Sequence, residues 1–159
     1  MKNIKINDTM NVSLPDSFEE MSREERAAYK DHSGDHGICF KSSELHIILS
    51  IAWTRVDGIR GVFSRMLRGK DLVKNMENWF KKQMKSFDYQ METRLNRQIG
   101  GLEAEGLRYS YTAQGIDMTG ETYSLEKDQT LYYFHCYYRS EFIEESQAAC
   151  GTIFDSVRW

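Results

Sequence analysis

Four strand-like segments follow one another between residues 89 and 139, and this run constrains the fold more than any other feature. The segments read YQMETRLNRQ, LEAEGLRYSYTA, DMTGETYSLEKD and QTLYYFHCYYR, with turn-rich residues between them. Strands joined by such short connections pair as antiparallel hairpins, because a parallel pairing needs a crossover of a dozen or more residues. We therefore expect a long antiparallel meander in this part of the chain.

Further strands and three helices flank the meander. A strand ends at Pro15, and GICFKS and LHIILSIAWT follow as two more; a short strand, SVRW, closes the chain. Helices are predicted at REERAAYK, behind a capping box SREE, at DLVKNMENWFKKQMKSF with Asp71 as its cap, and at SEFIEESQAACGTIFD with Ser140 as its cap. In the second helix, helical spacing of apolar residues places Trp79 and Phe80 on the buried side. This pattern predicts one α+β domain over residues 1–159, with a mostly antiparallel sheet of about six strands and helices on both faces.

Composition and charge narrow the class of protein. Hydrophobic residues make up 40% and charged residues 28% of the 159, which is typical of a globular domain. The net charge of -3 argues against a nucleic-acid binder, and no segment approaches the roughly 18 apolar residues of a membrane span. Three cysteines without paired spacing indicate thiols in a reducing compartment, and the first residues lack the apolar run of a signal peptide. We therefore expect a cytoplasmic location.

Three stretches carry a resemblance to a known fold family. They are VSLPDSF near the start, GLRYSY in the meander, and the closing helix that runs into IFDSVRW. With the order of elements, they make the chain resemble the PsbP-like proteins, which include extrinsic photosystem II subunits, a eukaryotic Ran-binding transport factor and many small bacterial proteins. The resemblance implies an α/β/α sandwich that serves for binding and brings no catalytic residues with it. Some bacterial relatives look like cytoplasmic chaperones for secreted effectors.

The stretch KDHSGDHGIC, residues 30–39, contains side chains that bind transition metals. His32 and His36 are four residues apart, with Asp35 between them. On a helix this spacing would place both imidazoles on one face. Ser33, Gly34 and Gly37 interrupt a helix here, and no second metal motif accompanies the pair. We therefore favour a polar loop without metal, and keep a small metal- or ligand-dependent enzyme using this loop as the alternative function.

Two other features are candidate binding surfaces. The stretch GIRGVFSRMLRGKD does not have the spacing of a phosphate-binding loop, but its apolar residues recur at helical spacing while Arg60, Arg65 and Arg68 occupy other faces. Such a basic helix either packs on the sheet or binds an acidic partner or an anionic membrane surface. In LYYFHCYYR, alternation places Tyr133, His135 and Tyr137 on one side of a strand. These rings either lie under a covering layer or line a groove for a ligand or partner.

No catalytic motif accompanies these features. The pair His135–Cys136 lacks a recognisable nucleophile arrangement, and no GxSxG sequence is present. We therefore expect a non-catalytic protein-binding module, of the adaptor or chaperone-like kind, without a cofactor. Its partner is expected to be another protein, and the sequence leaves a homodimer open.

Overall fold

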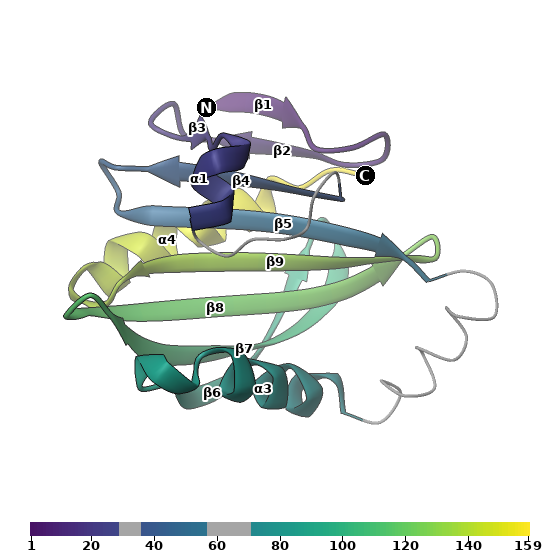
Figure 1. The fold of residues 1–159 in the computed structure, drawn as a ribbon. Coiled ribbons are helices and arrows are strands. Elements are labelled where there is room, and N and C mark those ends of the chain that lie inside the picture. Colours follow the sequence, from purple (N-terminus) through teal and green to yellow (C-terminus); the bar gives the residue numbers. More distant parts are fainter. Residues whose placement is uncertain (29–35, 57–70) are drawn as a thin grey trace.

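The computed structural model describes residues 1–28, 36–56 and 71–159, and its largest element is an antiparallel sheet of seven strands (Figure 1). The strands, in spatial order, are β3 (Glu19–Glu20), β4 (Gly37–Ser42), β5 (Ile47–Arg55), β9 (Thr130–Arg139), β8 (Ile116–Lys127), β7 (Leu102–Ala113) and β6 (Gln90–Ile99). Strands β1 (Lys2–Lys5) and β2 (Asn11–Leu14) form a separate hairpin. The helices are α1 (Arg23–Ala28), α3 (Leu72–Gln83) and α4 (Ile143–Asp155), with short 3-10 turns η2 (Lys85–Phe87) and η3 (Ser140–Phe142). No helix in these residues is long and apolar enough to cross a bilayer.

The predicted meander is confirmed as β6, β7, β8 and β9, each paired antiparallel with the next. Its first turn places Gly100 and Gly101 at φ values of 59° and 80°, a backbone region that glycine enters without steric cost. The α+β class is also confirmed. The expected number of about six strands was wrong for the main sheet, because the two-residue strand β3 extends it to seven while the strand before Pro15 pairs with β1 instead.

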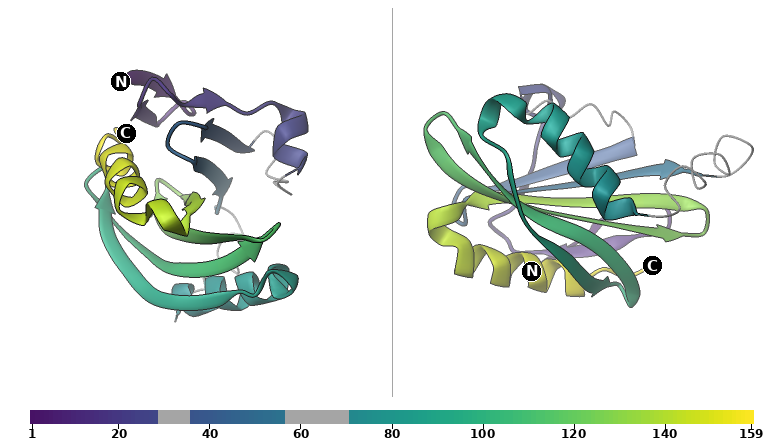
Figure 2. Two further views of the ribbon diagram at one scale, coloured as in Figure 1. Left: turned by 90° about the vertical axis from the view of Figure 1, so that its left-hand side faces the viewer. Right: turned by 90° about the horizontal axis from the view of Figure 1, so that it is seen from below.

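Helix α4 packs on the sheet face that carries the even-numbered residues of β9. Phe154 of α4 meets the rings of Phe134 and Tyr123 with centroids 6.0 and 5.4 Å away. The hairpin β1–β2 joins the same core through Val12 and Leu14, which are fully buried. Two backbone hydrogen bonds between Asn11 and Arg158 then hold the C-terminal residues to this hairpin, where a closing strand was expected. Figure 2 shows α3 and α4 on different sides of the strands.

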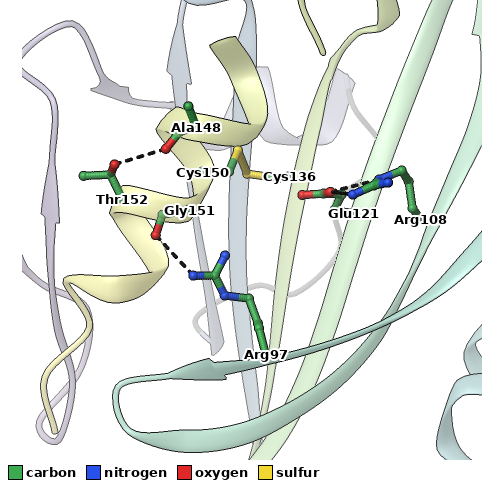
Figure 3. Close-up of a disulfide and its surroundings, with 8 residues drawn as sticks. All are labelled: Arg97, Arg108, Glu121, Cys136, Ala148, Cys150, Gly151 and Thr152. Atoms are coloured by element: carbon green, nitrogen blue, oxygen red, sulfur yellow. Dashed lines mark hydrogen bonds and ion pairs between the residues drawn. A yellow bond between two sulfur atoms is a disulfide. The ribbon is translucent and has the colours of Figure 1, made fainter. Parts of the chain in front are cut away.

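Cys136 and Cys150 form a disulfide between β9 and α4 (Figure 3), so the prediction of unpaired thiols was wrong for two of the three cysteines. The pairing follows from the chain path. Cys136 points toward the face that α4 covers, and α4 returns along β9, so that Cys150 comes to lie opposite it. Cys39 is a buried thiol on β4. The expected cytoplasmic location stays a prediction, but the cysteines no longer support it, because disulfides are typical of oxidising compartments.

Replacing Cys136 and Cys150 together with serine is expected to lower the free energy of unfolding by about 3 kcal/mol, because a cross-link over a loop of this length restricts the unfolded chain. Urea unfolding with and without reductant measures the effect. Reductant should lower the midpoint of the parent protein and leave that of the double variant unchanged. A parent midpoint that does not respond to reductant would contradict the prediction.

Two of the three predicted helix caps are confirmed. Ser22 and Glu25 form the reciprocal capping box of α1, with backbone-to-side-chain hydrogen bonds of 2.8 and 3.2 Å. The Asp71 carboxylate accepts a hydrogen bond of 3.0 Å from the backbone N–H of Lys74. The Ser140 prediction was wrong: Ser140 lies in η3, and its hydroxyl is 2.8 Å from that of Thr119 on β8.

The predicted burial of Trp79 was also wrong. Helix α3 buries Val73, Met76 and Phe80, whereas Trp79 is 56% exposed. Consecutive helical residues are about 100° apart around the axis. When Phe80 points directly at the sheet, the side chain of Trp79 therefore lies at the margin of the interface between helix and sheet. The apolar spacing in the sequence predicted the helix correctly, but it predicted that a larger part of the helix circumference is buried than the structure shows.

Candidate binding surface on the aromatic face of the sheet

Three rings of β9 stack along the sheet face opposite α4. The planes of Tyr133 and His135 are 10° apart with centroids at 6.1 Å, and those of His135 and Tyr137 are 5° apart at 5.9 Å. All three side chains are half-buried. They lie on one side of the strand, as alternation predicts, and we call them the aromatic row.

A hydrogen-bonded pair of hydroxyls lies beside the aromatic row, on the neighbouring strands β8 and β7. His135 is opposite Thr122 on β8, and its Nδ1 is 2.9 Å from the Thr122 hydroxyl oxygen. Thr122 Oγ1 is in turn 3.3 Å from the Tyr109 hydroxyl oxygen. These contacts fix the orientation of the imidazole, so the middle ring of the aromatic row is held before any partner arrives.

Gly120 makes room for this network. A Cβ atom at Gly120 would lie 2.4 Å from the ring of Tyr109, so only glycine lets that ring lie flat over β8. Tyr109 is fully buried, and burial raises its pKa well above the usual value, with a further contribution from Tyr137. Tyr109 therefore stays neutral near pH 7 and keeps a proton to donate.

Helix α3 borders the aromatic row through Phe80. The Phe80 ring lies 4.4 Å from that of Tyr109 and meets His135 edge-on at 6.3 Å. Trp79 stands against Phe80 edge-to-face at 5.1 Å and extends the aromatic surface outward. The hydroxyl of Tyr89 is buried without a hydrogen-bond partner in the described residues, and burial, reinforced by Glu77, raises the pKa of Tyr89 to about 12.

The arrangement favours binding over nucleophilic chemistry. The hydroxyl that is bonded to His135 belongs to Thr122, which is only 1% exposed and cannot reach a substrate. Half-buried rings, of which Tyr133 and Tyr137 also pack against the core cluster of α3, instead offer their remaining exposed apolar and polar atoms to a partner. The sequence patterns did not indicate Thr122, Tyr109 and Gly120, because only the pairing register of β7, β8 and β9 brings them next to His135 and Tyr137.

The other predicted sites fall largely outside the described residues. Arg60, Arg65 and Arg68 lie in that part of the chain, as do His32 and Asp35 of the metal alternative. His36 is described and is exposed immediately before β4. Among the residues described, no three or more His, Cys, Asp or Glu side chains are grouped so that they could hold a metal ion. The His32/His36 alternative therefore stays untested.

No known protein family and no curated protein matches this sequence. Solved structures do match its fold. The cyanobacterial PsbP protein (CyanoP) of Synechocystis sp. PCC 6803 is 11% identical with a TM-score of 0.59, over 95% of this chain and 86% of that one. A protein from Bacteroides thetaiotaomicron is 9% identical with a TM-score of 0.57, over 94% and 44%. The immunity protein TplEi of the T6SS of Pseudomonas aeruginosa, solved with a peptide named "L", is 12% identical with a TM-score of 0.52, over 77% and 46%.

These likenesses show a PsbP-like fold, as the sequence resemblance implied. The chain spans less than half the length of two of the three proteins. At identities of 9–12% the shared property is the fold alone.

Proposed function

We propose that this domain is a non-catalytic protein-binding module, adaptor or chaperone-like, and that its partner binds across the aromatic row. The observation that carries the proposal is the parallel stack of Tyr133, His135 and Tyr137, half-buried and anchored from the neighbouring strand through Thr122. Tyrosine is enriched at protein interfaces because it contributes a large contact area at a small cost in side-chain entropy. A row that is already ordered lowers that cost further.

The fold comparison is compatible with this role. TplEi, a protein of similar fold, was solved in complex with a peptide. For the present chain we propose an α/β/α sandwich whose partner is another protein, with no cofactor and no nucleic acid. The predicted basic segment with Arg60, Arg65 and Arg68 is proposed as a second contact, and the cytoplasm stays the proposed location.

Site-directed photo-cross-linking tests the proposal. A photoreactive phenylalanine analogue at Tyr137 is expected to yield one discrete cross-linked protein in cells that express the domain. Ile116, 37% exposed and close to the β7–β8 turn, is the matched control position and should yield none. Replacing Tyr133 with serine should also reduce the product formed from position 137. No product at 137, or the same products at both positions, would contradict the proposal.

A further inference from the structure

Exposed lysines gather on the outer side of α3 and the turn that follows it. Lys74, Lys81, Lys82 and Lys85 are all exposed. Glu77 is the acidic residue on this helix, and it already pairs with Lys81 at 3.1 Å. The whole chain has a net charge of -3, so the net charge of this helix is opposite in sign to that of the whole molecule.

Trp79 lies on the same helix, and no role in the protein core explains why a tryptophan stands at this exposed position. It is 56% exposed, the largest aromatic side chain so placed among the described residues. Tryptophan is among the residues that most often dominate the energy of protein interfaces. We call Trp79 with the four lysines the lysine–tryptophan face.

The spacing of these residues defines what could bind there. Lys82 follows Trp79 by three positions, so the two side chains are neighbours on the helix surface. Lys74 and Lys81 are seven positions apart and follow the opposite flank of the exposed side, with Lys82 between them and Trp79 around the helix axis. From Lys74 to Lys82 the helical rise gives about 12 Å, and Lys85 follows in the turn η2. A complementary segment therefore has acidic groups spread over this length and an apolar side chain that reaches Trp79.

We infer that the lysine–tryptophan face binds an acidic segment of a partner protein. The inference rests on the proposed function in so far as the partner is a protein, but it uses a different surface from the aromatic row. Phe80 connects the two surfaces, because it contacts both Trp79 and His135. One partner can therefore contact the rings with one segment and the lysines with another.

The free edge of the sheet is a weaker candidate for the same role. Strand β6 ends the sheet with ten residues, but its pairing with β7 shifts register between Met91 and Thr93. Glu92 and Arg94 are exposed along this strand. Bulges and charges are the features by which sheets prevent pairing with another strand, so β6 is protected and not prepared for a partner.

Fluorescence anisotropy with a defined probe tests the inference. The probe is a fluorescein-labelled peptide of repeated Glu-Glu-Glu-Leu units, titrated with the full chain at low and at physiological salt. The parent protein should bind it, and binding should weaken with salt because exposed charges are screened beyond about 8–10 Å at physiological ionic strength. Replacing Lys82 and Lys85 with glutamate should weaken binding about tenfold, since two exposed attractions become repulsions.

Two controls separate this site from general charge effects. Lys5→Glu with Arg23→Glu changes the net charge by the same amount on exposed residues away from α3, and should leave affinity nearly unchanged. Trp79→Ala should weaken binding without changing its dependence on salt. Equal losses in the two double variants, or no binding by the parent protein, would overturn the inference.

Binding to vesicles of phosphatidylcholine with phosphatidylserine is the last measurement. Binding to these vesicles in preference to the peptide would assign the face to a membrane surface and overturn the inference. If the lysine–tryptophan face does not bind the peptide, the cross-link expected at Tyr137 is unaffected. If the cross-link at Tyr137 is not formed while the peptide still binds, only the proposed function is contradicted.

Discussion

Replacing Phe80 with alanine is expected to lower the free energy of unfolding by about 3–5 kcal/mol. Phe80 is 3% exposed and lies at the centre of the smaller of the two core clusters, with Val73, Met76, Leu107 and Tyr109. Its removal deletes the ring that α3 places on Tyr109 and leaves a cavity that rigid neighbours cannot fill. Denaturant unfolding measures the loss, and an unchanged slope with denaturant would confirm that the unfolded state is the same.

The adjacent Trp79 is the matched comparison. Trp79→Ala removes a larger ring from the same helix but should change stability by less than about 1 kcal/mol, because most of that ring is already in water. Equal losses for the two variants would mean that α3 is rotated about its axis relative to the structure described here. A small loss for Phe80→Ala would mean that α3 contributes little to the fold.

Helix α3 shows how much of this fold the sequence could predict. Its existence and its Asp71 cap follow from local patterns, as do the capping box of α1 and all four strands of the meander. Local patterns set these elements because hydrogen bonds and apolar periodicity act within a few residues. The rotation of α3 depends on the sheet it packs against, so the pattern could not separate Phe80 from Trp79.

The candidate site was predictable only in part, for the same physical reason. Alternation along one strand places Tyr133, His135 and Tyr137 together. Thr122 and Tyr109 join them through the register of neighbouring strands, which depends on the exact two-residue turns after Ala113 and Lys127 and not on the alternation within one strand. The disulfide is a similar case, because Cys136 and Cys150 meet only through the packing of α4 on β9.

The ion pair of Arg108 and Glu121 gives the second large expected effect. These residues are opposite each other on β7 and β8. Glu121 is in turn paired with Cys136 of the disulfide on the next strand, β9 (Figure 3). Arg108 donates to one Glu121 oxygen from Nε at 3.0 Å and from Nη2 at 2.8 Å. The Glu121 side chain is only 6% exposed and that of Arg108 is 25% exposed. The carboxylate therefore depends on Arg108 for a counter-charge where water hardly reaches.

Arg108→Ala is expected to cost about 3–5 kcal/mol at neutral pH, because it leaves a buried carboxylate without its counter-charge. The double variant Arg108→Met with Glu121→Leu removes both charges and keeps similar volumes. It should return to within about 1 kcal/mol of the parent protein, since attraction within a buried pair does little more than offset the cost of desolvating it. Denaturant unfolding of the parent, the single variant and the double variant provides the comparison. If the double variant is as unstable as Arg108→Ala, the pair itself holds β7 to β8, and the loss cannot be assigned to an uncompensated charge.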